Sequence, residues 1–141
     1  MFINRREITI EWGDCDPAGI VYFPNYLKYF DNATSALFQS ALGLNKNEIL
    51  KKYAIKGIPL VDIGSRFFIP SAFGDVVTIE STVAELKRSS FRMQHRLLKG
   101  DAVAVEGFEV RVWTAVDPAN PDKLRSQPIP DEVVARLRAP R

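Results

Sequence analysis

The chain has 141 residues, with 19 Lys and Arg against 17 Asp and Glu, one Cys and one His. This length suits one domain over residues 1–141, and 46% hydrophobic with 26% charged residues is ordinary for a globular protein. One Cys excludes an internal disulfide and a multi-cysteine zinc site, and one His excludes a multi-histidine metal cluster. An enzyme of this composition must rely largely on carboxylates, hydroxyls or backbone dipoles.

The formal net charge of +2 is too small to indicate a nucleic-acid binder. Residues 1–7 lack the apolar stretch of a signal peptide. No apolar run approaches the roughly 20 residues of a transmembrane helix. We therefore expect a cytoplasmic protein with neither a membrane nor a nucleic-acid partner.

The first third of the chain predicts a strand, a loop and a long helix. Apolar residues alternate over residues 8–12, which is typical of a half-buried strand. A turn-rich stretch over residues 13–19 leads to a helix over about residues 24–42, with proline in its first turn. Gly43 is a suitable C-terminal stop. The helix carries one broad apolar face.

The rest of the chain predicts mostly strands. Asn45 and Glu48 have the spacing of a capping box, which predicts a short helix over residues 46–53. Gly100 and Asp101 suit a hairpin turn. Period-2 alternation predicts four strands in a meander, over residues 61–69, 77–83, 91–97 and 102–116.

Three smaller features complete the pattern. Gly107 predicts a bulge or bend inside the last strand. Residues 131–137 suggest a short C-terminal helix, and we interpret Arg136, Arg138 and Arg141 as a solvated basic face. Because the helix and most strands each show one apolar face, those faces must cover each other. The expected fold is α+β, an antiparallel sheet wrapped around one long central helix.

The loop before the long helix carries the chemical signal. It places carboxylates a few residues ahead of a helix N-terminus, where unpaired N–H groups and a partial positive charge stabilise negative charge. A carboxylate beside a polarised carbonyl suits acyl transfer or hydrolysis. Two glycines, Gly13 and Gly19, allow the backbone to approach a ligand closely.

This loop and the element order resemble the hot-dog-fold acyl-CoA thioesterases, and within them the 4-hydroxybenzoyl-CoA thioesterase type. The resemblance spans nearly the whole chain. The matching residues are Asp14-x-Asp16-Pro17-Ala18-Gly19-Ile20-Val21, Pro24-Asn25-Tyr26, Phe30-Asp31, Gly57-x-Pro59, Gly74-Asp75 and Lys87-Arg88-Ser89-Ser90-Phe91.

The resemblance assigns roles to individual residues. Asp16 matches the catalytic carboxylate, which either attacks the thioester carbonyl or acts as general base toward water. The backbone N–H of Phe23 matches the donor that polarises the thioester oxygen. Asp31 matches the acid that meets the para-hydroxyl of a hydroxybenzoyl ring, and Tyr22 and Tyr26 are expected beside the acyl pocket.

The same resemblance implies how coenzyme A and a second subunit are used. Lys87, Arg88 and Ser90 match an exposed turn that receives the phosphates of coenzyme A, and Arg125 is a weaker candidate for that contact. Coenzyme A is then part of the substrate, and neither a separate cofactor nor a metal is expected. The resemblance also implies a homodimer with active sites at the subunit interface, and a homotetramer of two dimers.

Other interpretations of these residues remain open at this stage. Asp14 suits a structural role in the turn, and Cys15 between two acids would have a raised thiol pKa, which disfavours a catalytic cysteine. His95 fits a packed, hydrogen-bonded strand residue, and no Gly-x-Ser-x-Gly elbow accompanies it. Asp31 can also be a solvated helix residue, and basic residues such as Lys87 often only solvate a turn.

The leading hypothesis is an acyl-CoA thioesterase that hydrolyses 4-hydroxybenzoyl-CoA or a related benzoyl-CoA to the free acid and coenzyme A. One alternative is a non-catalytic module that binds acyl thioesters. Another is a thioesterase for short aliphatic acyl-CoA or acyl carrier protein thioesters. Hydration or dehydration chemistry is disfavoured because His95 lies far in sequence from the carboxylate loop.

Overall fold

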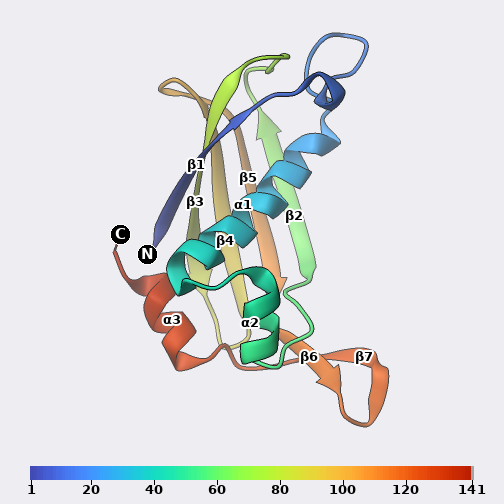
Figure 1. Cartoon of the computed structure of the whole chain (residues 1–141), viewed down its shortest axis with the longest axis vertical. Helices are drawn as coiled ribbons and strands as arrows, with labels where there is room; N and C mark the ends of the chain where they lie inside the picture. The colour runs from blue at the N-terminus through green and yellow to red at the C-terminus, as the bar shows by residue number, and fades with distance from the viewer. Residues whose placement is uncertain (141) are drawn as a thin grey trace.

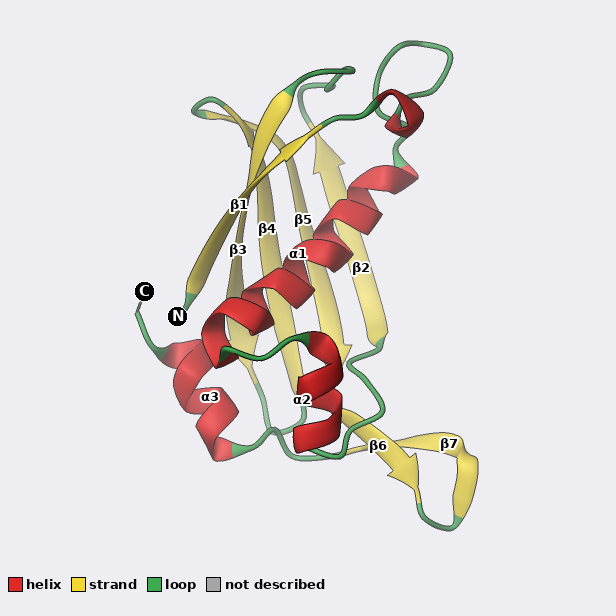
Figure 2. Cartoon of the chain, in the orientation of Figure 1, coloured by secondary structure: helices red, strands yellow, loops and turns green. Residues whose placement is uncertain are grey.

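One long helix lies across the inner face of a five-stranded antiparallel sheet in the computed structural model, which describes residues 1–140 (Figures 1 and 2). The elements in chain order are β1 (Ile3–Thr9), the 3-10 turn η1 (Trp12–Asp14), α1 (Pro24–Leu42), α2 (Lys46–Lys52), β2 (Leu60–Phe67), β3 (Val76–Leu86), β4 (Ser90–Lys99), β5 (Ala102–Val112), β6 (Thr114–Asp117), β7 (Asn120–Ser126) and α3 (Asp131–Arg138).

The helices predicted over residues 24–42 and 46–53 are confirmed as α1 and α2. Helix α1 ends at Gly43, whose left-handed backbone (φ 70°) lets its N–H donate to the Gln39 carbonyl at 2.9 Å. Helix α2 opens with the expected capping box, in which Asn45 and Glu48 exchange side chain-to-backbone hydrogen bonds of 2.9 and 3.0 Å. The apolar face of α1 is buried through Tyr26, Tyr29, Phe30, Ala33, Leu37, Phe38 and Ala41.

The strand order is β1-β3-β4-β5-β2, so the predicted four-strand meander is wrong. Within the five-stranded sheet of residues 1–140, only β3, β4 and β5 follow one another as hairpins. Strand β2 pairs with β5 at the far edge, with Ser65 opposite Gly107, and the chain then crosses the end of the sheet to reach β3 (Figure 1). Period-2 alternation reports which face of a strand is buried and does not report which strand lies beside it.

Two strand boundaries also differ from the prediction. Strand β1 begins at Ile3 and ends at Thr9, paired with β3, whereas Trp12 lies in a 3-10 turn with 77% of its surface exposed. The last predicted strand breaks at the buried Trp113, after which β6 pairs with β7 as a separate hairpin. Strand β7 was missed because its seven residues are all exposed and lack an apolar alternation.

Gly107 lies in regular register, opposite His95 and Ser65, so the predicted bulge at this residue is wrong. Its lack of a side chain serves close packing instead. A Cβ atom at this position would lie 2.7 Å from Cε2 of Phe30 and 2.9 Å from Oγ of Ser65. The glycine therefore lets α1 approach β5 closely.

The C-terminal helix α3 closes the lower end of the core. The Phe2 N–H donates to the Leu137 carbonyl at 2.7 Å, which joins the two ends of the chain. Arg136 and Arg138 are exposed, as predicted, and Arg141 lies outside the described residues. No helix within residues 1–140 combines the length and apolarity needed to cross a bilayer.

Candidate active site

The carboxylate loop between β1 and α1 is held by Asp14. The Asp14 side chain accepts from the Glu11 N–H at 3.0 Å, and its backbone carbonyl accepts from Asn25 Nδ2 at 2.8 Å and from the Tyr22 N–H at 2.9 Å. The predicted structural role of Asp14 is therefore confirmed. Burial, together with the nearby Asp14 carboxylate, raises the pKa of Tyr29, which stays a neutral phenol.

Asp16 lies at the tip of this loop. Its N–H donates to the Ile20 carbonyl and its own carbonyl accepts from the Gly19 N–H, both at 2.9 Å, while Gly19 takes a positive φ of 82°. Its Oδ1 accepts from the Ala18 N–H at 2.9 Å, a local turn that fixes the carboxylate. Its Oδ2 has no hydrogen bond within residues 1–140, so one oxygen is oriented and the other is available.

The turn between β2 and β3 supports this loop. The Val21 N–H donates to the Ser71 carbonyl at 2.9 Å, and an isolated bridge joins Ile20 to Ala72. The supporting turn is itself braced by Asp75, whose carboxylate accepts from the Ala72 N–H and pairs with Lys99. These contacts hold the pKa of Asp75 below its ordinary value.

Phe23 stands at the start of α1 and carries the first open donor of the helix. The following residue, Pro24, has no N–H, while the N–H groups of Asn25 and Tyr26 donate to the Tyr22 and Phe23 carbonyls. Within the part of the chain that the structure describes, the Phe23 N–H has no hydrogen-bond acceptor. No side chain among residues 1–140 caps this helix end. Its amide and the helix dipole can therefore polarise an incoming oxygen.

The aromatic residues around this helix start differ in exposure. The Tyr22 and Phe23 side chains are 52% and 61% exposed, with ring centroids 5.7 Å apart. Tyr26 is only 4% exposed and packs against Phe67, with centroids 5.5 Å apart. Tyr22 is thus open to a ligand, whereas Tyr26 forms the packed wall behind it, and contact of either with a substrate stays a prediction.

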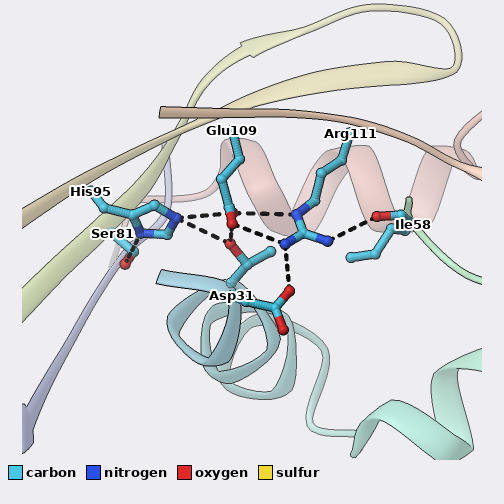
Figure 3. Close-up of polar contacts among 7 residues, drawn as sticks. Asp31, Ile58, Ser81, His95, Glu109 and Arg111 are labelled. Carbon is cyan, nitrogen blue, oxygen red and sulfur yellow. Dashed lines mark hydrogen bonds and ion pairs between the residues drawn. The ribbon is translucent and has the colours of Figure 1, made fainter. Parts of the chain in front are cut away.

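Asp31 lies on α1, eight residues beyond Phe23, which corresponds to roughly 12 Å along the helix. Its side chain is 53% exposed, and its Oδ1 accepts from Arg111 Nη2 at 2.6 Å (Figure 3). The helix thus presents a carboxylate that touches solvent on one side and a buried guanidinium on the other. The alternative interpretation of Asp31 as a solvated helix residue agrees with its exposure but does not account for its ion pair with Arg111.

Arg111 belongs to a buried polar network on the inner face of the sheet (Figure 3). Its guanidinium pairs with Glu109 through Nε (3.2 Å) and Nη2 (2.9 Å), and Glu109 accepts from Thr34 Oγ1 and lies 3.0 Å from His95 Nε2. Although burial opposes its charge, the bonds from His95 and Arg111 hold the pKa of Glu109 below its ordinary value. The two carboxylates keep the pKa of Arg111 raised.

His95 is fully buried and hydrogen-bonded, as predicted. Its Nδ1 lies 2.7 Å from Ser81 Oγ, so Ser81, His95 and Glu109 follow one another like a serine–histidine–acid triad. None of the three exceeds 4% exposure. Since no substrate carbonyl can reach Ser81, the arrangement is structural.

Lys87, Arg88 and Ser90 lie at the turn between β3 and β4. Strand β3 has 11 residues, which corresponds to roughly 35 Å, and it starts next to the turn that supports the Asp16 loop. The basic turn and Asp16 therefore lie at opposite ends of the sheet within one chain (Figure 1). Arg88 is exposed, and Lys87 Nζ lies 3.8 Å from Glu85. Arg125 lies on β7, four residues before Ile129, whose N–H donates to the Arg88 carbonyl at 2.8 Å.

Sequence reasoning missed Glu109 and Arg111. Both alternate in phase with Val105 and Gly107, so period 2 places them on the buried face of β5. Two opposite charges at the apolar positions of a strand predict a buried ion pair, because charged side chains are buried only when they are paired. This pattern could have identified both residues. Within residues 1–140 no group of three or more His, Cys, Asp or Glu side chains is arranged to hold a metal ion.

Comparisons with known proteins agree with this geometry. The family model of the thioesterase-like superfamily matches residues 10–137. The 4-hydroxybenzoyl-CoA thioesterase of Pseudomonas sp. (strain CBS-3) is 33% identical over 92% of this chain and 96% of its own length. Its three-dimensional structure superposes with a TM-score of 0.85 and 31% identity, covering 95% of this chain and 98% of that one.

Two further proteins show the same similarity. The structure of a gentisyl-coenzyme A thioesterase superposes with a TM-score of 0.82 and 32% identity, over 95% of this chain and 99% of that chain. A 1,4-dihydroxy-2-naphthoyl-CoA hydrolase of Gloeothece citriformis (strain PCC 7424) is 29% identical over 92% of this chain and 87% of its own. The predicted hot-dog arrangement of sheet and central helix is confirmed by these structures.

Proposed function

The chain belongs to the thioesterase-like superfamily and is a thioester hydrolase, and we propose that its substrate is an aryl-coenzyme A thioester, with 4-hydroxybenzoyl-CoA as the first candidate. The relatives named above act on hydroxylated aryl-CoA thioesters, which supports an aryl substrate. The observation that carries the proposal is one loop that holds both the Asp16 carboxylate and the open Phe23 amide.

These two groups supply the parts that thioester hydrolysis needs. The Phe23 N–H and the N-terminus of α1 stabilise the negative charge that develops on the thioester oxygen. Asp16 then either attacks the carbonyl carbon, forming an anhydride that water opens, or removes a proton from the attacking water. In both routes the carbon–sulfur bond breaks, and the products are the carboxylic acid and coenzyme A.

Asp31 is the proposed contact for a ring hydroxyl. Its position, roughly 12 Å along α1 from Phe23, matches the reach of a benzoyl group and its contacts. A carboxylate accepts a hydrogen bond from a phenol and leaves an unsubstituted ring without a partner. We therefore expect hydroxylated benzoyl groups to be preferred, with Tyr22 and Tyr26 beside the ring.

A second subunit completes the proposed site. Because the Lys87–Arg88 turn lies far from Asp16 within one chain, the phosphates of coenzyme A can meet that turn only on a neighbouring chain. Strand β2 forms an edge of the sheet and exposes apolar side chains, which makes it the proposed dimer edge. We propose a homodimer joined through β2 and a homotetramer of two such dimers. Light scattering measures the mass of the assembly in solution and tests both proposals. The exposed apolar residues of β2 are Leu60, Val61, Ile63 and Phe67.

Steady-state hydrolysis with a substrate panel tests the proposed function. We expect 4-hydroxybenzoyl-CoA to be turned over faster than benzoyl-CoA, and both faster than short aliphatic acyl-CoA thioesters. The substitution Asp16→Asn keeps the shape of the loop and removes the base, so kcat should fall by about 10²–10⁴-fold with little change in KM. The matched control is Asp122→Asn, an exposed acid on β7. Equal turnover by the Asp16 and Asp122 variants would sink the assignment.

A further inference from the structure

We propose that Arg111 is a positioning residue that sets substrate preference by fixing the carboxylate of Asp31 toward the ring hydroxyl. The inference rests on the proposed function, in which Asp31 meets that hydroxyl. Arg111 lies on β5 and Asp31 on α1, 80 residues apart in the sequence, and their 2.6 Å contact joins the two layers of the fold (Figure 3).

Arg111 is already committed to protein acceptors. Of its five N–H groups, four donate to protein: Nε and Nη2 to Glu109, Nη2 again to Asp31, and Nη1 to the Ile58 carbonyl at 2.9 Å. The residue is 4% exposed. It therefore has little capacity to bind a substrate directly, and its influence on one must pass through Asp31.

Asp31 is held on one side only. Its Oδ1 accepts from Arg111, whereas its Oδ2 has no hydrogen bond among residues 1–140 and half of the side chain faces solvent. A lone exposed aspartate on a helix would exchange between rotamers. The charge-assisted bond to a buried guanidinium restricts that exchange and leaves the second oxygen as a fixed acceptor.

The support behind Arg111 is rigid. Glu109 grips the guanidinium with both carboxylate oxygens, and it is itself held by Thr34 and His95. None of these side chains is exposed by more than about 5%, so the network cannot reorganise without opening the core. One arginine also faces two carboxylates, which leaves Asp31 a strong acceptor for a further hydrogen bond.

A purely structural ion pair between Glu109 and Arg111 would stabilise the fold without affecting substrate preference. The decisive readout is therefore the ratio of kcat/KM for 4-hydroxybenzoyl-CoA to that for benzoyl-CoA. We expect Arg111→Lys to lower this ratio by about tenfold or more, because a charged hydrogen bond to the hydroxyl is misaligned. Benzoyl-CoA turnover should change much less, since that ring offers no hydroxyl to Asp31.

A double variant provides a second test that does not leave a buried charge without its partner. Replacing Arg111 alone can strand the buried charge of Glu109, whereas Glu109→Gln with Arg111→Gln removes both charges and keeps amide hydrogen bonds. In this variant too, the ratio of kcat/KM for 4-hydroxybenzoyl-CoA to that for benzoyl-CoA should fall. In an Asp31→Ala background this ratio is already low, and adding Arg111→Lys should lower it no further. A fall of the same size in both backgrounds would show that Arg111 acts independently of Asp31 and would overturn the inference.

The complex of the Asp16→Asn protein with 4-hydroxybenzoyl-CoA gives a second measurement that leaves the network intact. We expect its crystal structure to show the phenol oxygen on Asp31 Oδ2 while Oδ1 stays on Arg111. A phenol bound elsewhere, or Asp31 released from Arg111, overturns the inference.

The outcomes also separate this inference from the proposed function. If the wild-type protein hydrolyses neither aryl-CoA thioester, both fail together. If it hydrolyses them without a hydroxyl preference, or if the preference survives in the double variant, the thioesterase assignment stands and the role of Arg111 is rejected.

Discussion

The ring of Phe30 lies flat against the ring of His95, with centroids 4.9 Å apart and planes 2° from parallel. Phe30 belongs to α1 and His95 to β4, so this stack fixes the helix to the sheet one residue before Asp31. Gly107 on β5 leaves the space that the Phe30 ring occupies, because any side chain at this position would meet that ring. The placement of the proposed specificity residue thus depends on a glycine that touches no substrate.

The first prediction concerns that glycine. Gly107→Ala places a Cβ 2.7 Å from Cε2 of Phe30 and 2.9 Å from Oγ of Ser65, while the Phe30 ring is already stacked on His95, so unfolding should need about 1–3 kcal/mol less free energy. Urea denaturation measures the change. Gly57→Ala is the matched control, because nothing lies within 4 Å of its added Cβ. Equal losses in the two variants would contradict the packing role of Gly107.

The second prediction separates the Phe23 amide from its side chain. Phe23→Ala keeps the N–H and should leave kcat within a few-fold of the wild-type value. Phe23→Pro removes the N–H at a φ of −53° that proline can adopt, and should lower kcat by about 10²–10³-fold. Circular dichroism measures whether both variants fold. Similar kcat values for the two variants would argue against amide polarisation.

The third prediction follows from the lowered pKa of Glu109. Because its pKa is lower folded than unfolded, this carboxylate contributes stability that is complete above about pH 4.3, the ordinary value, and is lost as the pH falls through the folded pKa. Glu109→Gln should cost about 1.5–3 kcal/mol at neutral pH. The same substitution should also make the free energy of unfolding depend less on pH at acidic pH.

Urea unfolding between about pH 3 and pH 7 checks this expectation. The comparison variant is Glu106→Gln, which lies on the opposite face of the same strand and makes no contact with His95 or Arg111. If the Glu106 variant reduces this pH dependence as much as the Glu109 variant does, the buried network is not the source of the acid sensitivity.

The fourth prediction tests the basic turn. Lys87→Ala with Arg88→Ala should raise KM for 4-hydroxybenzoyl-CoA by about tenfold, because charge-assisted contacts to phosphates are lost. The same variant should handle the N-acetylcysteamine thioester of 4-hydroxybenzoate normally, since that substrate has no phosphates. Lys56→Ala with Lys123→Ala removes two positive charges at exposed positions and controls for net charge. An equal rise in KM for both thioesters would point away from phosphate binding.

The local sequence determined the elements that hold the reacting groups. The proline-started helix, its Gly43 end, the capping box of α2 and the turn-rich Asp16 loop all depend on residues within a few positions of one another. Such features can be predicted from the sequence because backbone conformation and capping are short-range effects. For the same reason the structural role of Asp14 could be predicted.

Only the tertiary structure decided which of these elements meet. That β2 lies beside β5, that β7 exists, and that the Lys87 turn is remote from Asp16 all follow from strand pairing over long sequence separations. The contact of Arg111 with Asp31 spans 80 residues. Charges of this kind enter a core only when folding supplies their partners, and those partners are chosen by three-dimensional packing, which no local pattern encodes.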